Sequence, residues 1–328
     1  MTDSDAKILW GAQALWQQLV PLLPGLSIEV VRSAPSTNSA LLERARIRPE
    51  ERRDAGNAGV RRSVESAAFG RREADLQPCL LVAEHQSAGR GRQGRTWKSA
   101  PGASLTFSLG LPLTLADWSG LSLAVGVALC DALDPSAGSA NGLRLGLKWP
   151  NDLWLVDVGG AGRKLGGILI ETVAVGMQRL AIIGIGLNVL PFDAADLNSG
   201  FATLRELDAT ATAPAALARV ALPLVQALKL FERDGFGAFA ARFAQRDLLR
   251  GRVVHTTRPD VPQGIGRGAS EQGALLVETA TGIVTIASGE VSVRLDERAA
   301  TPTPAPTPRP TLAPAPTPAP ARPSSPTS

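Results

Sequence analysis

A short run of glycines and arginines is the part of this sequence best suited to chemistry. It spans residues 86–97, reads QSAGRGRQGRTW, and directly follows an apolar strand-like run at residues 80–83. Glycine allows the backbone to turn tightly and to approach a ligand closely, because it has no Cβ. Arginine is permanently charged and donates paired hydrogen bonds to carboxylate or phosphate oxygens. The run therefore predicts a loop that surrounds a small anion.

Other interpretations of this loop are weaker. Residues 89–94 match the GxGxxG pattern of dinucleotide-binding folds. In those folds a helix begins at the loop, and its N-terminus holds the pyrophosphate. Residues 98–102 lead instead into another strand pattern, so we interpret the match as coincidental. Nucleic-acid phosphate is a further candidate anion, but Trp97 is the only aromatic residue of the loop that could stack on a base.

Three later segments combine glycine with charged or amide side chains. They are residues 148–152 (KWPND), 164–171 (KLGGILIE) and 184–189 (GIGLNV). Considered alone, Lys164 predicts a surface charge, and the Asn-Asp pair of the first segment predicts a turn. The glycines are more informative, because glycine weakens a strand unless something must approach its backbone. These segments therefore also point to a ligand-binding surface.

The elements that position these motifs alternate in type. Strand-like apolar runs are found at residues 28–31, 79–84, 104–111, 143–148, 164–173 and 180–189. Helical periodicity is found at residues 39–46, which residues 36–38 can cap, at 118–133, and at 214–247 with an interruption at 234–235. Several strands follow one another without a helix between them, which favours a mixed or antiparallel sheet. We therefore predict an α+β fold, a mixed β-sheet with helices.

Changes in composition divide the chain. Residues 49–78, rich in Arg, Glu, Gly and Ala, predict a surface insertion. Residues 249–297 contain short strand-like runs between glycine turns, which predicts a small C-terminal β-barrel of SH3-like size. Residues 298–328 are almost entirely Pro, Ala, Thr and Ser, a composition typical of a disordered tail. The predicted domains are therefore 1–248 and 249–297, followed by that tail.

Composition also limits the location and the cofactors. The net charge of +4 permits an acidic partner without requiring one. The acidic N-terminus lacks a signal-peptide pattern, and no apolar run approaches the roughly 20 residues of a membrane helix, so we expect a cytoplasmic protein without a membrane partner. Cys79 and Cys130 lie in apolar runs and predict buried, reduced thiols. Together with His85 and His255 they show no metal-ligand spacing.

In combination, the segments resemble the biotin protein ligase family, also called biotin–[biotin carboxyl-carrier protein] ligases. The shared motifs, in the family's order, are residues 36–38, 86–97, 148–152, 164–167 and 184–188, with 273–278 and 289–292 in the C-terminal domain. Ordered motifs of this number are far more specific than one glycine-rich loop. Bifunctional members also carry an N-terminal helix-turn-helix domain that binds an operator. Fewer than forty residues precede Ser36, so we expect a monofunctional ligase that binds no operator DNA.

The resemblance implies an enzyme that uses biotin, ATP and Mg²⁺. The biotin carboxylate attacks the α-phosphate of ATP and forms biotinyl-5′-adenylate and pyrophosphate. A specific lysine of a biotin carboxyl carrier protein, from acetyl-CoA carboxylase or a related carboxylase, then attacks the adenylate and releases AMP. The alternatives are a lipoate–protein ligase of the same superfamily and a non-enzymatic nucleic-acid-binding protein. Ligand-linked homodimers are known in the family, and the sequence leaves the oligomeric state open.

The resemblance also implies roles for individual residues. Those implied in catalysis are Arg90, Arg92, Asp152 and Lys164. Those implied in biotin binding are Ser36, Thr37, Asn38, Gln86, Arg90, Gly91, Arg92, Lys164, Gly166 and Gly167. Those implied in binding ATP or the adenylate are Gly89, Gly91, Arg92, Gly94, Arg95, Trp97, Asn151, Asn188 and Phe201. Asp152 has three candidate roles: orienting Mg²⁺, accepting the proton of the acceptor lysine, or stabilising a turn. Phe201 could stack on adenine or pack in the core. Mg²⁺ is expected to arrive on the ATP phosphates rather than on dedicated protein ligands.

Overall fold

The larger sheet of the protein has eight strands. The computed structural model describes residues 8–46, 65–69, 76–136, 142–192, 201–287 and 293–295. In chain order the strands are β1 (Ser27–Ala34), β2 (Glu65–Phe69), β3 (Cys79–Gln86), β4 (Ser104–Pro112), β5 (Arg144–Lys148), β6 (Asp152–Val156), β7 (Gly162–Val175) and β8 (Gln178–Asn188). They pair in the order β2-β1-β3-β4-β8-β7-β6-β5. β1 and β3 are parallel, and the other neighbours are antiparallel. The predicted mixed sheet and α+β fold are confirmed.

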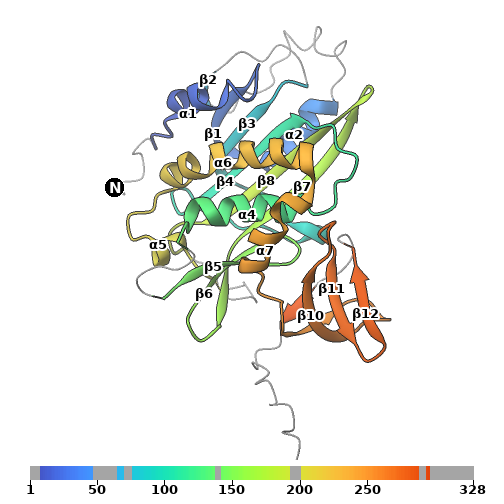
Figure 1. Ribbon diagram of the computed structural model, residues 1–328. Helices are drawn as coiled ribbons and strands as arrows, with labels where there is room; N and C mark the ends of the chain where they lie inside the picture. Colours follow the sequence, from blue (N-terminus) through green and yellow to red (C-terminus); the bar gives the residue numbers. More distant parts are fainter. Residues whose placement is uncertain are drawn as a thin grey trace, which may run out of the picture. The chain divides into compact units, whose positions relative to one another are not determined.

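Helices pack on both faces of this sheet. α4 (Leu121–Leu133) and α6 (Ala213–Asp234) lie together over one face (Figure 1), and α2 (Thr37–Arg46) packs on the other. The two faces are distinguished by alternate strand residues: Leu80 and Ile183 belong to the core with α4 and α6, whereas Leu81 and Ile182 pack with α2. The other helical segments are α1 (Ala12–Leu19), η1 (Arg92–Gly94), α5 (Leu204–Leu207), η2 (Phe236–Phe239) and α7 (Ala240–Arg246).

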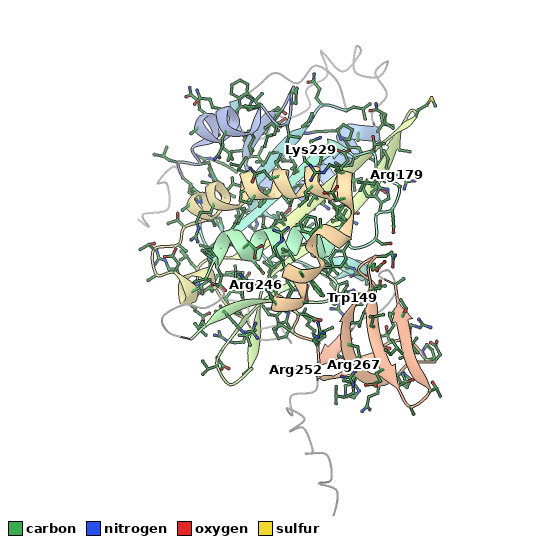
Figure 2. The ribbon with its side chains drawn as sticks, viewed as in Figure 1. Trp149, Arg179, Lys229, Arg246, Arg252 and Arg267 are labelled. Carbon is green, nitrogen blue, oxygen red and sulfur yellow. The ribbon has the colours of Figure 1, made fainter. Side chains whose placement is uncertain are left out.

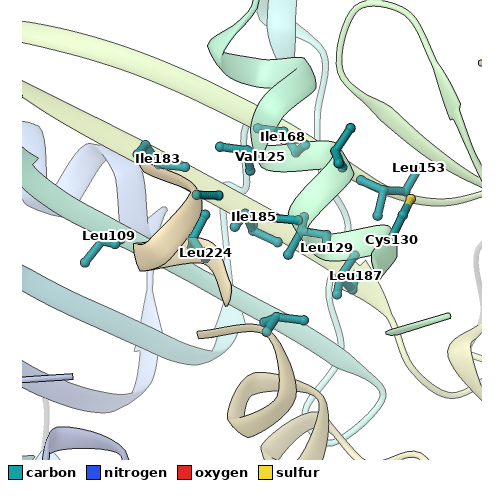
Figure 3. Packing of buried hydrophobic residues seen from close by; sticks show 14 of the residues in the cluster. Leu109, Val125, Leu129, Cys130, Leu153, Ile168, Ile183, Ile185, Leu187 and Leu224 are labelled. Atoms are coloured by element: carbon teal, nitrogen blue, oxygen red, sulfur yellow. The ribbon is translucent and has the colours of Figure 1, made fainter. Parts of the chain in front are cut away.

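Alternation along β4 and β8 creates one apolar face and one face of small or polar residues, called here the small-residue face. The apolar side chains of both strands are buried beside those of α4 and α6, as Figure 3 shows for Leu109, Ile183 and Leu187. On the opposite face the paired residues are small: Thr106 lies across from Gly186, and Ser108 across from Gly184. Because a strand directs successive side chains to opposite faces, a large core and a face of small residues, on which other side chains can pack closely, are built from the same two strands.

A second, antiparallel sheet follows near the C-terminus. Its strands are β9 (Val253–Thr256), β10 (Gln263–Ala269), β11 (Leu275–Thr279), β12 (Gly282–Ile286) and β13 (Val293–Leu295), in the order β12-β11-β10-β9-β13. The sequence did not indicate β10, because glycine occupies alternate positions in it and no apolar alternation results. Trp149 lies beside this sheet in Figure 2, and its Nε1 donates to the Gly273 carbonyl at 3.1 Å. The domain limits at residues 248 and 297 stay a prediction, and the tail lies outside the described residues.

Some expected elements begin or end elsewhere. β2, within the expected insertion at residues 49–78, pairs with β1 and adds an edge strand to the sheet, although five residues were too few to show a periodic pattern. The rest of that insertion up to residue 75 lies outside the described residues. Asp152 begins β6 rather than completing a turn, because Leu153 and Leu155 alternate into the core. α4 begins at Leu121 rather than at residue 118, because Gly120 before it is left-handed (φ 77°).

Helix α6 corrects the expectation about apolar runs. By length and mean hydropathy it is the single helix among the described residues that could cross a membrane, and half of its most apolar window is buried in the protein. Its buried residues, Leu217, Val220, Leu224 and Leu228 among them, form a stripe with helical spacing. Charged residues such as Arg219 lie between them. The helix is amphipathic, and the stripe packs in the core.

Candidate functional site

The glycine/arginine loop, residues 86–97, folds back on itself between β3 and β4. The Gly91 amide donates to the Arg95 carbonyl at 2.7 Å, and the Trp97 amide donates to the Gly89 carbonyl at 2.8 Å. A Cβ at Gly89 would lie 2.3 Å from the Trp97 carbonyl oxygen. Only glycine allows the two arms of the loop to approach this closely.

The tip of the loop is one 3₁₀ turn, η1. Within it Gln93 adopts φ 54°, and Gly94 adopts φ 72°. No α-helix begins there, and the chain continues into β4. The GxGxxG match therefore has no helix N-terminus to hold a pyrophosphate, and its interpretation as coincidental is confirmed.

A group of buried polar side chains, called here the polar cluster, lies on the small-residue face of the sheet beside this loop. Its members are Thr37, Asn38, Gln86 and Ser108, with exposed fractions of 3%, 2%, 8% and 0%. Gln86 Oε1 accepts from the Thr37 amide at 2.7 Å, and Ser108 Oγ lies 2.6 Å from both Thr37 Oγ1 and Asn38 Oδ1. Ser36 is buried beside the cluster, and its Oγ caps α2 by accepting from the Ser39 amide at 3.5 Å. Helix α2 thus begins at Thr37, two residues earlier than expected, which places Thr37 and Asn38 in its first turn.

The amide of Asn38 has a defined orientation. Its Nδ2 donates to the Leu169 carbonyl at 3.1 Å and to Glu171 Oε2 at 2.9 Å. Its Oδ1 can only accept, so the Ser108 hydroxyl donates to it. A Cβ at Gly184 would lie 2.2 Å from this Oδ1. With both N–H groups engaged, Asn38 has only a lone pair of Oδ1 left to offer.

Glu171 of β7 joins the loop to the polar cluster. Its Oε1 accepts from Arg90 Nη2 at 2.9 Å, while its Oε2 accepts from Asn38 and, at 3.4 Å, from Arg90 Nη1. Arg90 Nη1 also donates to Ser39 Oγ at 3.3 Å. The sequence assigned no role to Glu171 or to Ser108. The signal for Ser108 was available in the polar–apolar alternation of β4; for Glu171 there was none, because its partners lie 81 and 133 residues away.

A second group, called here the charged cluster, comprises Arg92, Asn151, Asp152 and Lys164. Arg92 Nη1 donates to Asn151 Oδ1 at 3.1 Å, and Lys164 Nζ donates to Asp152 Oδ1 at 2.8 Å. Asn151 is itself anchored, because its Nδ2 donates to the Ile168 carbonyl at 3.0 Å. Burial lowers the pKa of Arg92, and Arg95 lowers it further, whereas the nearby carboxylate of Asp152 opposes both. Because the ordinary pKa of arginine is so high, Arg92 keeps its charge.

The strand glycines differ in what they make room for. A Cβ at Gly186 would lie 2.5 Å from the ring of Trp97, and a Cβ at Gly166 would lie 2.5 Å from Leu187 Cδ2. Gly167 is different, since its nearest neighbours would be at 3.6 Å or more, an ordinary contact distance. The protein itself therefore requires glycine at 166 and 186, whereas at Gly167 a Cβ would fit without a clash.

Strand pairing brings the two clusters together. Gly167 lies opposite Asp152 on one side and opposite Gly186 on the other. Gly184, which underlies Asn38, is two residues from Gly186, about 7 Å along the strand. The polar and charged clusters thus lie side by side on one face, with the loop tied to both by Arg90 and Arg92.

Two residues expected to meet the adenylate lie at the edge of this arrangement. Asn188 Nδ2 donates to the Lys164 carbonyl at 3.4 Å, and Lys164 and Phe201 form a parallel backbone bridge. The Phe201 ring packs edge-on against Phe192 with a centroid distance of 5.1 Å. Its stacking on adenine stays a prediction. Among the described residues no three His, Cys, Asp or Glu side chains gather as a metal site.

Outside the site, the expectation for the cysteines is confirmed. Cys79 and Cys130 are buried and form no disulfide, and burial raises the pKa of Cys130 to about 12. The Cys130 thiol is therefore not suited to act as a nucleophile at neutral pH.

Comparison with known proteins identifies the family. Residues 71–188 match the biotin/lipoate A/B protein ligase family, and residues 251–294 match the biotin protein ligase C terminal domain. A biotin–[acetyl-CoA-carboxylase] ligase from Mycobacterium tuberculosis is 31% identical over 86% of this chain and 91% of its own length. The chain belongs to the biotin protein ligase family.

Other family members agree in sequence and in fold. The bifunctional ligase/repressor BirA from Salmonella typhimurium is 36% identical over 66% of this chain and 67% of its own length. The structure of the biotin protein ligase from Aquifex aeolicus in complex with biotin and ATP matches 82% of this chain and 99% of that one, with 25% identity and a TM-score of 0.61. The family assignment made from five ordered motifs is confirmed.

Proposed function

We propose that this protein activates biotin with ATP as biotinyl-5′-adenylate and transfers the biotinyl group to a specific lysine of a biotin carboxyl carrier protein. The observation that carries this proposal is the position of two unlike clusters side by side on one face of the sheet. The polar cluster has buried groups that can form hydrogen bonds with an uncharged polar ring, and the charged cluster has cations that can bind phosphate. Biotinyl-5′-adenylate carries both an uncharged polar ring and a phosphate, so it matches both clusters.

The polar cluster favours biotin over lipoate. The ureido ring of biotin donates through two N–H groups and accepts through one oxygen, so it can pair with Asn38 Oδ1 and with the hydroxyl groups of Thr37 and Ser36. The dithiolane ring of lipoate offers no such donors. It would leave the remaining hydrogen-bonding capacity of these side chains unused, while the bonds that they make within the protein stay the same.

In the first step two anions must react. A carboxylate oxygen of biotin attacks the α-phosphorus of ATP, the bond to the bridging oxygen breaks, and pyrophosphate leaves with the electron pair. Arg92 and Lys164 are placed to offset the repulsion and to stabilise the charge that develops on the phosphate oxygens. Their anchoring by Asn151 and Asp152 holds the two cations in place before the substrates bind. We assign Asp152 the task of orienting Lys164.

In the second step the lysine amine of the carrier attacks the carbonyl carbon of the adenylate. The bond to the phosphate oxygen breaks, AMP leaves, and the amine loses a proton to form the amide. The enzyme's part is to hold the mixed anhydride away from water until the carrier arrives. The glycine/arginine loop is suited to this, because its Trp97 ring lies against Gly186 and its Arg90 and Arg92 bind side chains on the small-residue face of the sheet.

Magnesium fits this site as a companion of the phosphates. Asp152 is the one carboxylate of the charged cluster, and it lies beside two cations. Mg²⁺ commonly binds through substrate phosphates with one or two carboxylates. Bound there with ATP, the ion would neutralise charge on the leaving pyrophosphate, and Asp152 is the residue that could contact it.

The carrier is proposed to be a subunit of acetyl-CoA carboxylase or a related carboxylase, and the cytoplasm, which supplies ATP, is the proposed location. Homodimer formation and the absence of operator binding stay predictions.

The decisive experiment incubates the protein with biotin, ATP, Mg²⁺ and an apo carrier domain and measures the mass of the carrier. We expect the addition of one biotinyl group, and no lipoyl group when lipoate replaces biotin. Lipoylation without biotinylation would identify a lipoate ligase. No modification, together with DNA binding that weakens steeply with salt, would favour the nucleic-acid-binding alternative.

A further inference from the structure

The carboxylate of Glu171 connects three parts of the fold. It lies on β7, its Oε1 binds Arg90 of the loop, and its Oε2 binds Asn38 at the start of α2. The side chain of Glu171 is 21% exposed and that of Arg90 is 45% exposed. The pair is therefore partly shielded from water, and a charge-assisted hydrogen bond there is stronger than one at an open surface.

The loop needs such an attachment. Its base is joined to the end of β1, because the amides of Ser87 and Ala88 donate to the carbonyls of Ala34 and Pro35 at 3.0 and 2.9 Å. Its backbone hydrogen bonds between Gly89 and Trp97 and between Gly91 and Arg95 only close it on itself. Beyond the base, the attachment of the loop therefore comes from side chains. Arg90 supplies one across 81 residues of sequence, with two of its nitrogens directed at one carboxylate.

We propose that Glu171 is a positioning residue that latches the glycine/arginine loop onto the sheet through Arg90 and thereby retains the adenylate. The proposal rests on the proposed function for the identity of the retained ligand. The latch itself is a property of the protein and can be measured without a ligand.

The latch separates the tasks of Arg90 and Arg92. Glu171 neutralises Arg90, which makes Arg90 a structural anchor rather than the main cation for phosphate. The Arg92 guanidinium donates to the neutral amide of Asn151 in the charged cluster. Glu171 also occupies one N–H of Asn38, so it fixes which atoms of that amide face a ligand.

The test replaces Glu171→Gln and compares it with Glu29→Gln. Glu29 is a matched control, since it also lies on a strand and accepts from an arginine, Arg44 of α2, at 2.7 Å, with 15% exposure. Two rates are measured: dissociation of preformed biotinyl-5′-adenylate, and trypsin cleavage after the loop arginines in the ligand-free protein. We expect Glu171→Gln to raise both about tenfold, as expected for losing one partly exposed charged hydrogen bond. Glu29→Gln should change each less than twofold.

A double-mutant cycle separates a latch from general loss of stability. We expect strongly non-additive effects on adenylate dissociation when Arg90→Ala, Glu171→Ala and the double variant are compared. Each single change already breaks the contact between Arg90 and Glu171, so the second change has no further contact to break. The proposal is overturned if the fold-changes in dissociation rate of the two single variants multiply in the double variant. It is also overturned if the rate of trypsin cleavage is unchanged in Glu171→Gln. If the wild-type protein forms no adenylate, the proposed function fails, and the trypsin comparison still decides whether the latch exists.

Discussion

Replacing Gly184→Ala tests how the sheet supports the polar cluster. The new methyl group would lie 2.2 Å from Asn38 Oδ1 and 2.9 Å from its Cγ. Non-bonded heavy atoms prefer about 3.5 Å, so the amide must move by about 1 Å. Asn38 is 2% exposed and has no space to move without breaking contacts. The hydrogen bonds at risk are those with Ser108 at 2.6 Å and with the Leu169 carbonyl at 3.1 Å.

The expected magnitude follows from those bonds. A buried polar group that loses its partner costs about 1–3 kcal/mol, and about 1.4 kcal/mol corresponds to tenfold in affinity. We expect the dissociation constant for biotin to rise about 10- to 100-fold in Gly184→Ala, measured by isothermal titration calorimetry. The free energy of unfolding should fall by about 1–3 kcal/mol, because the same bonds stabilise the fold.

The matched control is Gly237→Ala. An added Cβ there has no heavy atom within 4 Å, and the residue lies in η2, outside the site. We expect its biotin affinity to stay within about twofold of wild type. The reasoning is refuted if Gly184→Ala also binds biotin within twofold of wild type, or if a crystal structure of that variant shows Asn38 unmoved.

Three further predictions concern single side chains. Arg92→Ala should speed dissociation of the adenylate about tenfold or more while leaving the melting temperature nearly unchanged, as stopped-flow and calorimetry can measure; an unchanged rate contradicts the assignment. Gly167→Ala meets no protein atom closer than 3.6 Å, so it should fold normally yet weaken biotin binding, and normal binding would show that no ligand passes over that strand. Burial raises the pKa of Asp247 to about 6, and its Oδ2 has no hydrogen-bond partner. A folded-state pKa above the unfolded value means that the folded protein binds more protons between the two values, so this contribution to stability is lost as pH rises through about 6. Between pH 5 and 7.5 the wild type should lose about 1 kcal/mol of unfolding free energy relative to Asp247→Asn, and parallel urea-unfolding profiles for the two proteins would contradict this.

Much of the fold could be predicted because it is encoded in local patterns. β4 alternates Ser104, Thr106 and Ser108 with Leu105, Phe107 and Leu109, and the structure places these sets on opposite faces. Such alternation is visible in any strand that is covered on one side by helices. β10 carried no such pattern, since glycines occupy three of its seven positions, and β2 was too short to show one.

The site could be predicted only in part. The glycine/arginine loop and the ligase motifs were visible, because their residue types are unusual and their order is specific. The packing reason for Gly186 was not, because a Cβ there would meet Trp97, 89 residues earlier in the chain. A sequence pattern shows that a strand glycine needs an explanation, but not which side chain provides it.

By itself, the sequence determined the α+β class, the family and the loop that carries the cations, because periodicity and motif order are local properties. The tertiary structure alone decided that Glu171 meets both Arg90 and Asn38, and that the polar and charged clusters share one face. The physical reason is strand order. β7 lies beside β8 and β6, and β8 lies beside β4. The register of β4 and β8 makes neighbours of residues more than 60 positions apart, and no local pattern specifies that register.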